Sequence, residues 1–358
     1  MAAVRPASRR AVLFTPDDPL ALASGSSLSE VEVAFETYGE LDADGGNAVF
    51  VCHALTGDAH ATEWWSEMVG PGKPIDTDRF FVICPNLLGG CRGTTGPRSV
   101  DPTSGTRYDL GFPQLDMLDF VSVHRALLRH LGVARLHAAI GGSLGGMQIL
   151  QWAVTAPEEV GRAVLVGASS RLTAMNIAFS NVARAAILGD PEFVSGSYEE
   201  GAGPRLGLRI ARMLAHITYL SEEGLEERFG RRLQHEGPPR RDFGVDFAVE
   251  SYLAHQGEVF LDRFDALSYL YLSRVMDYFD PFADPSAAGR VAAGGTRFLV
   301  VSFDSDWRFS TAHSTRIAEH LASAGVPVEQ HEFATRHGHD AFLMRVPGYQ
   351  EAVTAFVG

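Results

Sequence analysis

The short run Gly141-Gly142-Ser143-Leu144-Gly145 constrains the fold of this chain more than any other feature. An apolar stretch, His137 to Ile140, precedes it, and an apolar helical pattern begins at Met147. A G-x-S-x-G sequence between a strand and a helix predicts a sharp turn that holds the serine in a strained backbone conformation. The first and last glycines of the motif lack a Cβ, which allows the strand and the helix to approach closely. We therefore predict that Ser143 is a catalytic nucleophile.

Short apolar segments alternate with helical patterns through the first half of the chain. Strands are expected at residues 48–53, 80–84, 137–140 and 163–167, and helices at 117–131 and 147–156. This alternation predicts a mostly parallel sheet with helices on both faces. Together with the serine turn it indicates an α/β-hydrolase fold.

The pattern changes after about Ser170. The chain is mainly helical from Leu172 to about Asp280, and strand patterns return at 298–301 and 328–333. A helical insertion between late strands predicts a cap subdomain above the nucleophile, and 358 residues exceed the usual size of one domain. We predict a core formed by residues 1–171 and 288–358, with a helical cap at 172–287.

A serine nucleophile requires a base and an acid that orients the base, in the chain order serine, acid, histidine for this fold. The strand at 298–301 is followed by Asp304 and Asp306, of which Asp306 lies in the loop proper and is favoured as the triad acid. After the last strand come His337 and His339. His339 follows a glycine and opens an apolar helix, so it is favoured as the base, with His337 as the alternative.

The oxyanion of the reaction needs two backbone amides. One is expected from Leu144, directly after the nucleophile, and the second from Leu55, in a loop that follows an early strand. His53, in the same loop, is interpreted as a structural histidine. These parts alone do not distinguish water from another acyl acceptor.

Composition excludes several classes of function. The net charge of −14 argues against nucleic acid or an anionic membrane as a partner. The three cysteines are too few and too scattered for a disulfide framework or a zinc site, and no metal site is expected. No apolar run approaches 18 residues, so no membrane span is expected, and the protein is predicted to be cytoplasmic.

Several longer motifs resemble the homoserine O-acyltransferase family of α/β-hydrolase enzymes. They occur, besides the serine turn, at residues 53–58 (HALTGD), 70–77 (GPGKPIDT), 86–97 (NLLGGCRGTTGP), 148–152 (QILQW), 211–221 (ARMLAHITYLS) and 338–343 (GHDAFL). The resemblance implies transfer of an acyl group from acyl-CoA to the side-chain hydroxyl of L-homoserine, on the route to methionine. It also implies a homodimer associated through the cap helices, and no bound cofactor.

The resemblance further implies roles for three residues outside the triad. Arg212 and Tyr219, seven residues apart on one helix face, match residues that reach the acceptor, and Asp340 matches the contact to its amine. A guanidinium holds a carboxylate and a carboxylate holds an ammonium, so these charges suit a zwitterionic acceptor. The implied mechanism is ping-pong, with the acyl group carried on Ser143.

Arg308, two residues after Asp306, is the residue that indicates which acyl donor is used. The sequence Trp-Arg-Phe here is similar to the succinyl-transferring branch, and an arginine suits the carboxylate of succinyl-CoA. We therefore predict a homoserine O-succinyltransferase. Acetyl-CoA stays the alternative donor, because the stretch after residues 59–61 lacks an insertion that some succinyl-type members carry. Serine as acceptor, or water as in a carboxylesterase, are the more distant alternatives.

Overall fold

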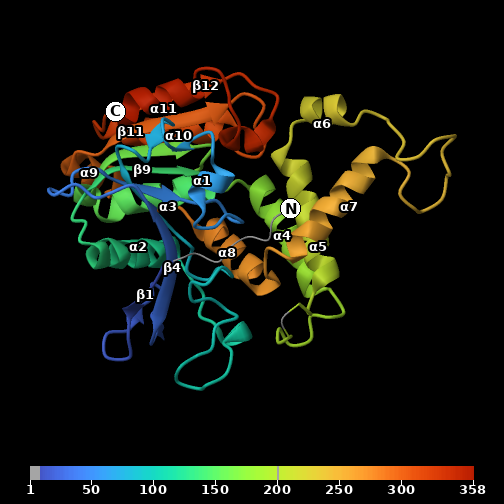
Figure 1. Cartoon of the computed structure of the whole chain (residues 1–358), viewed down its shortest axis with the longest axis horizontal. Coiled ribbons are helices and arrows are strands. Elements are labelled where there is room, and N and C mark those ends of the chain that lie inside the picture. Colours follow the sequence, from blue (N-terminus) through green and yellow to red (C-terminus); the bar gives the residue numbers. More distant parts are fainter. Residues whose placement is uncertain (1–8, 200) are drawn as a thin grey trace.

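An eight-stranded sheet forms the centre of the protein in the computed structural model, which describes residues 9–199 and 201–358 (Figure 1). The strand order is β1-β4-β8-β5-β9-β10-β11-β12. From β8 to β12 neighbouring strands are parallel, while β1 pairs with β4, and β4 with β8, in the antiparallel sense. The strands of this sheet are β1 (Arg9–Phe14), β4 (Val31–Tyr38), β5 (Ala48–Cys52), β8 (Phe81–Pro85), β9 (Leu136–Gly142), β10 (Val160–Val166), β11 (Arg297–Phe303) and β12 (Val328–Phe333).

Two small strand pairs and eleven α-helices complete the described part of the chain. The pairs are β2 (Leu20–Ala21) with β3 (Ser27–Leu28), and β6 (Val69–Gly70) with β7 (Ile75–Asp76). The helices are α1 (Ala61–Trp64), α2 (Met117–Leu131), α3 (Leu144–Thr155), α4 (Ala174–Leu188), α5 (Arg205–Tyr219), α6 (Glu222–Arg228), α7 (Ala248–Leu261), α8 (Ala266–Tyr278), α9 (Ala287–Gly294), α10 (Thr311–Ser323) and α11 (Tyr349–Val357). Short 3-10 turns occur at Asp109–Gly111, Pro157–Glu159, Pro281–Ala283 and Gly338–Leu343.

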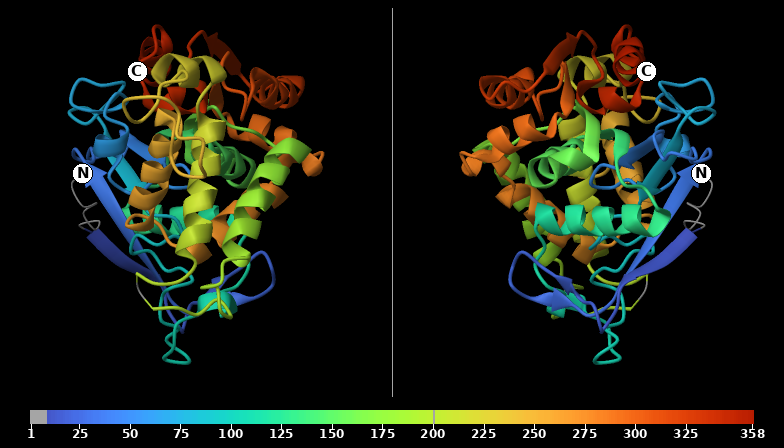
Figure 2. Two further views of the ribbon diagram at one scale, coloured as in Figure 1. Left: turned by 90° about the vertical axis from the view of Figure 1, so that its right-hand side faces the viewer. Right: turned by 90° about the vertical axis from the view of Figure 1, so that its left-hand side faces the viewer.

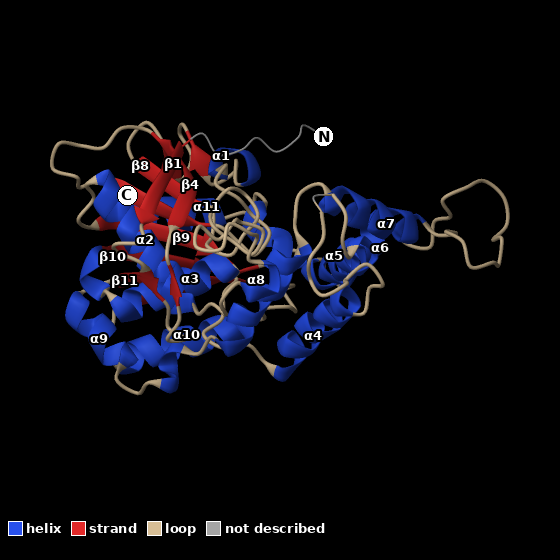
Figure 3. Ribbon diagram, turned by 90° about the horizontal axis from the view of Figure 1, so that it is seen from below, coloured by secondary structure: helices blue, strands red, loops and turns tan. Residues whose placement is uncertain are grey.

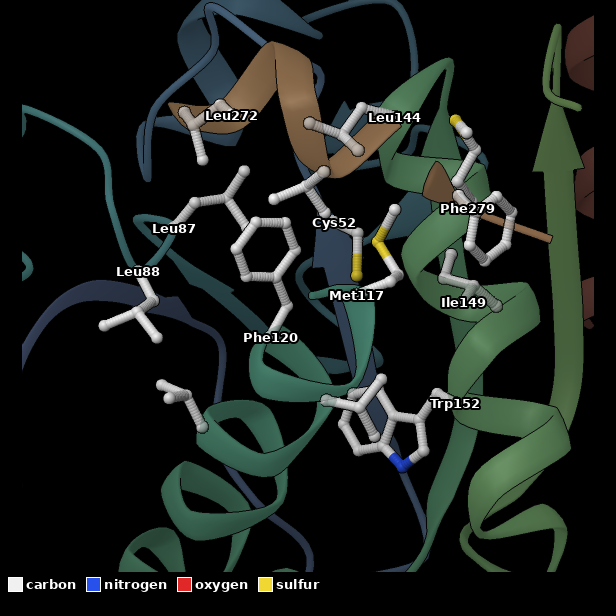
Figure 4. Close-up of a cluster of buried hydrophobic side chains, with 14 of the residues drawn as sticks. Cys52, Leu87, Leu88, Met117, Phe120, Leu144, Ile149, Trp152, Leu272 and Phe279 are labelled. Carbon is white, nitrogen blue, oxygen red and sulfur yellow. The ribbon is translucent and has the colours of Figure 1, made fainter. Parts of the chain in front are cut away.

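Alternate side chains of the central strands enter two separate cores, because successive residues of a strand point to opposite faces. In β5, Phe50 and Cys52 join the core formed with α2 and α3, whereas Val49 and Val51 join the core on the α11 side. Figure 4 shows the first of these cores, where side chains of β5, α2, α3 and α8 meet. Burial on both faces explains why these strands are apolar without alternation.

The helices α4, α5, α6 and α7 lie together on one side of the sheet, as Figures 1 and 3 show. They follow β10 and precede α8, whose side chains are almost all buried and contribute to the core shared with α2 and α3. The left view in Figure 2 shows α5 in front of the sheet and next to α4, in agreement with the close packing of these helices. The loop between α6 and α7 projects furthest from the sheet (Figure 3).

The α/β-hydrolase fold expected from the sequence is confirmed, and the strand at 328–333 and the helix at 117–131 have the expected bounds. Two details differ. The antiparallel strands β1 and β4 had no counterpart among the expected strands, and His339 lies in a 3-10 turn that ends at Leu343 instead of opening an α-helix. The core and cap ranges stay a prediction, since helix positions do not define a folding unit; residues 1–8 of the first range fall outside the described residues.

Candidate active site

Ser143 occupies a strained turn between β9 and α3. Its φ of 56° and ψ of −124° are rare for a residue with a side chain, and its amide donates to the Val166 carbonyl at 2.9 Å. A Cβ on Gly145 would overlap the carbonyl oxygen of Cys52, and one on Gly141 would lie 2.5 Å from the Gly145 carbonyl carbon. These glycines are therefore required for the close approach of β5, β9 and α3 around the serine.

The amide of Leu144 is the first of α3, so it has no intrahelical acceptor and is available to an anion above the serine. Leu55, from the loop after β5, lines the same cavity as Ser143. The loop is folded back on itself, since the Gly57 amide donates to the Ala54 carbonyl at 2.9 Å. Both predicted oxyanion residues thus border the serine, from two different segments.

Gln148 links these two segments through hydrogen bonds. Its fully buried side-chain amide donates to the His53 carbonyl at 3.1 Å and to the Leu144 carbonyl at 3.2 Å. Its oxygen lies 2.9 Å from Nε2 of the buried His124. One side chain is therefore hydrogen-bonded to the loop that carries Leu55 and to the helix that begins with Leu144.

His339 and Asp306 form a buried pair beside Ser143. Nδ1 of His339 lies 2.7 Å from Oδ2 of Asp306, and Oδ1 of Asp306 accepts the Phe309 amide at 2.8 Å. Both side chains are almost fully buried, and His339 lines the serine's cavity. With both carboxylate oxygens bonded, the aspartate is fixed in position and holds the imidazole in one orientation.

The structure separates the alternatives that the sequence left open. Asp304 is exposed and accepts the Thr335 amide at 2.9 Å, so it does not orient His339. His53 is bonded at both ring nitrogens to backbone groups: one lies 2.7 Å from the Ala54 carbonyl, and the other accepts the Leu87 amide at 3.2 Å. Burial lowers the pKa of His53, which fits the neutral structural histidine expected there.

A cavity of about 200 Å³ opens above the serine, and residues distant in sequence line it. Arg212 and Tyr219 enter from α5, and Asp340 from the turn that carries His339. The ring of Tyr219 lies 5.7 Å from the His339 ring, measured between centroids. The three residues that the resemblance assigned to the acceptor are thus brought together with the predicted nucleophile and base.

The cavity contains side chains of opposite charge. The guanidinium of Arg212 lies over the Phe260 ring at 4.7 Å and donates only a long bond of 3.5 Å to the Thr56 hydroxyl, and its buried Nε has no partner among the described residues. Burial raises the pKa of Asp340, and the charges of His339 and Arg212 partly oppose that shift. The cavity therefore offers a cation and an anion to one small molecule.

Arg263, in the loop between α7 and α8, also lines this cavity, and the sequence analysis did not identify it. Burial lowers the pKa of its guanidinium, and the nearby positive charge of Arg212 adds to the shift. Nothing in the local sequence marks it, because it is brought to the site only by the return of the chain from α7. An arginine in a loop is ordinarily a surface residue.

Arg308 lies beside the cavity and not inside it. It borders an adjoining hollow of about 20 Å³ between α4, α5 and α8, and its guanidinium lies 5.5 Å from the Phe179 ring. Leu55 and Tyr219 line both spaces. Within residues 9–199 and 201–358, no carboxylate lies within 4.0 Å of the Arg308 guanidinium.

The described residues contain neither a cluster of metal-ligating side chains that could hold an ion nor a helix long and apolar enough to cross a membrane. Cys52, Cys84 and Cys91 are free thiols, the first two fully buried.

Residues 47–344 match the family model described as alpha/beta hydrolase fold. A homoserine O-succinyltransferase of Nocardioides sp. is 55% identical over 361 residues, spanning 98% of each chain. A homoserine O-acetyltransferase of Rhodopseudomonas palustris is 47% identical over 98% of this chain and 90% of its own. Relatives this similar carry both names, so similarity supports an acyltransferase without separating the two donors.

Solved structures agree on the fold. The crystal structure of a homoserine O-acetyltransferase from Bacillus anthracis superposes with a TM-score of 0.88 at 26% identity, covering 98% of this chain and 97% of that one. The crystal structure of esterase E22 gives 0.87, also at 26% identity, over 98% and 100% of the two chains. The same architecture thus occurs in an acyltransferase and in an esterase.

Proposed function

The chain belongs to the homoserine O-acyltransferase family of the α/β-hydrolase superfamily, and we propose that it transfers a succinyl group from succinyl-CoA to the hydroxyl of L-homoserine, on the route to methionine. One observation supports a zwitterionic acceptor. The cavity that holds Ser143 and His339 also presents the guanidinium of Arg212 and the carboxylate of Asp340. An ester of a simple alcohol needs neither charge.

In the first half-reaction His339, oriented by Asp306, takes the proton of the Ser143 hydroxyl. The serine oxygen attacks the thioester carbonyl carbon, and the amides of Leu55 and Leu144 stabilise the resulting oxyanion. The C–S bond then breaks, His339 returns the proton to the leaving sulfur, and coenzyme A departs. The succinyl group remains on Ser143 as an ester.

In the second half-reaction L-homoserine enters the same cavity. Arg212 binds its carboxylate, with Tyr219 beside it, and Asp340 binds its ammonium group. His339 takes the proton of the homoserine hydroxyl, whose oxygen attacks the acyl carbon; the bond to Ser143 breaks and the proton returns to the serine oxygen. An acceptor held at both ends is favoured over water by its proximity and orientation.

Arg308 supports succinyl-CoA over acetyl-CoA as the donor. Its guanidinium has no carboxylate partner among the described residues and borders a hollow that adjoins the nucleophile's cavity. The hollow takes only the end of an acyl chain. A carboxylate there would pair with the guanidinium, whereas the methyl group of an acetyl donor would leave it unpaired.

Replacement of this arginine tests the donor. Arg308→Leu is expected to lower kcat/KM for succinyl-CoA about tenfold or more, the size of a lost charge-assisted bond, and to leave acetyl transfer within about threefold. The measurement is thiol release with L-homoserine and each thioester. Arg135→Leu, an exposed residue in the turn before β9 and so at the opposite end of the strands, is the matched control. Equal losses with both donors would exclude Arg308 as the reader of the succinyl carboxylate.

The proposal includes further parts that follow from the family. The enzyme acts as a cytoplasmic homodimer joined through the cap helices, with acyl-CoA as co-substrate and no bound cofactor or metal. The alternative acceptor, L-serine, differs from homoserine by one methylene, which is worth about 1–3 kcal/mol in a pocket. A comparison of kcat/KM for the two amino acids distinguishes them.

A further inference from the structure

A second, larger cavity of about 370 Å³ lies next to the reaction cavity and is lined by arginines from three segments. Its guanidinium groups come from the loop after β8, the start of α5 and the loop before α8. The arginines are Arg92, Arg98, Arg107, Arg205 and Arg263. Arg263 also lines the reaction cavity, so the two spaces share a wall.

Three of these arginines are engaged in the protein itself. The guanidinium of Arg98 lies 2.5 Å from an oxygen of Asp109 and also donates to the Tyr198 carbonyl, which holds two loops together. Arg107 lies 3.7 Å from the Glu199 carboxylate, and Arg205 lies 3.6 Å from that of Glu258. These three residues therefore line the cavity with their charges already paired within the protein.

The other two arginines have no such partner. Within the described residues, no carboxylate lies within 4.0 Å of the guanidinium of Arg92 or Arg263, and the buried Nε of Arg263 makes no hydrogen bond. The charges of Arg212 and Arg92 both act on Arg263 to lower its pKa, in addition to burial, while Asp58 opposes them. Like charges gathered without counter-charges are destabilising, and a bound anion would remove the repulsion.

The arrangement of these groups indicates what kind of anion fits. Arg212 is assigned to the acceptor in the reaction cavity. Arg92 and Arg263 are therefore the arginines that can bind an anion in the second cavity. Guanidinium groups bind phosphate oxygens through paired hydrogen bonds, and several of them around one cavity suit a multiply charged phosphate. The protein as a whole carries a charge of −14, so this concentration of arginines is local.

We propose that this cavity binds a phosphate group of the nucleotide end of the acyl donor, with Arg92 and Arg263 as its ligands. The inference rests on the proposed function only in taking a coenzyme A thioester as the donor. The acyl end of the donor then extends past Arg263, which lines both cavities, to Ser143. Affinity for the donor comes from a site separate from the chemistry, so the acyl group itself can stay small.

The test compares full-length and truncated donors. The wild-type enzyme is expected to use succinyl-CoA with a kcat/KM at least about tenfold above that of succinyl-pantetheine, which lacks every nucleotide phosphate. Arg92→Gln is expected to raise KM for succinyl-CoA about tenfold with kcat unchanged, and to leave both constants for succinyl-pantetheine as in the wild type. Arg297→Gln, whose exposed side chain pairs with Glu329 at the sheet edge, is the control for loss of one positive charge.

A binding measurement separates this inference from the function. Calorimetric titration with coenzyme A and with pantetheine, without acceptor, is expected to show weaker binding of coenzyme A alone in Arg92→Gln. If the wild type released no thiol but still bound coenzyme A through Arg92, the phosphate site would stand and the proposed reaction would not. Equal binding of coenzyme A by the wild type and Arg92→Gln, or equal losses with both thioesters, would overturn the phosphate site.

Discussion

The pKa of the Asp340 carboxyl group is subject to two opposing effects, burial and nearby positive charge. It follows His339 directly and lines the reaction cavity. Burial raises its pKa, and the positive charges of His339 and Arg212 partly oppose that shift; within the described residues no ion pair joins Arg212 and Asp340. An ammonium group that enters the cavity would favour the ionised form of this carboxyl group.

We expect this raised pKa to appear in acceptor binding. Because the ionised carboxylate holds the ammonium group, KM for L-homoserine should rise as the pH falls through the pKa of Asp340. That pKa is raised, so the rise should begin at a higher pH than for an ordinary aspartate. Steady-state kinetics with varied homoserine at saturating donor, over a pH series, measures it.

Asp340→Asn should raise KM for homoserine about tenfold to a hundredfold and remove this pH dependence, since the amide does not titrate. Asp304→Asn, an exposed aspartate in the loop before Asp306, is the control and should behave as the wild type. An unchanged KM in Asp340→Asn would exclude the residue from acceptor binding.

Individual residues also show where sequence reasoning reached its limit. The order serine, acid, histidine left Asp304 beside Asp306, and only the loop conformation, in which Asp306 accepts the Phe309 amide, brings one of them to His339. Arg263 could not be found at all, since its place in the cavity depends on the path of the chain between α7 and α8. Motifs of contiguous residues, by contrast, were sufficient to select Ser143 and His339, which line one cavity and whose catalytic roles stay predictions.

At the level of elements, the start of α3 is the centre of the site. Ser143 precedes it, Leu144 begins it, and Gln148, one turn later, bonds to the carbonyls of Leu144 and His53. The segments that carry the two predicted oxyanion amides are thus linked through a single side chain. Gln148 is a positioning residue, because it does not line the cavity itself.

Removal of the Gln148 amide should lower the rate more than binding. In Gln148→Leu the loop that carries Leu55 loses its hydrogen-bonded link to α3. We expect kcat to fall about tenfold to a hundredfold, with KM for both substrates within about twofold. This loss is smaller than the reduction of about 10²–10³ in kcat that follows complete removal of one oxyanion donor. Gln151→Leu, on the same helix and with a side chain that donates to the Thr155 hydroxyl instead of to these carbonyls, is the matched control. If the two variants had equal kcat, the positioning role would be wrong.

The elements themselves were predictable where local patterns are strong. The apolar strands of the parallel sheet and the capped helix α2 were expected from residues that are close in sequence. In the antiparallel β4, Val31, Val33 and Phe35 enter the core, and Glu32 and Glu36 keep the apolar run to three residues, so a search for continuous apolar runs passes over this strand. The 3-10 turn at His339 ends after six residues, a length that depends on tertiary packing.

For the whole molecule, α4 and α5 expose several large apolar side chains. Met175 and Val182 lie seven residues apart on α4, and Ile210 and Ile217 have the same spacing on α5, so each pair shares one helix face. All four are more than a third exposed. Exposed apolar side chains that share a helix face suit an interaction surface, consistent with the proposed homodimer.

Charges on this surface should dissociate the dimer. We expect Val182→Lys combined with Ile210→Lys to give a monomer in sedimentation velocity at concentrations where the wild type is a dimer. Val12→Lys, an exposed valine on the edge strand β1, should leave the dimer intact. A wild-type monomer, or a dimer that survives the double substitution, would contradict association through the cap helices.

In the proposed reaction the whole molecule holds an acyl group on Ser143 between two half-reactions. Intact-mass spectrometry of the enzyme mixed with succinyl-CoA, without acceptor, tests this directly. We predict a species heavier by one succinyl group, mapped to the peptide that contains Ser143, absent in Ser143→Ala and discharged on addition of L-homoserine. Turnover without any such species, or an acyl group on another residue that homoserine discharges equally fast, would contradict it.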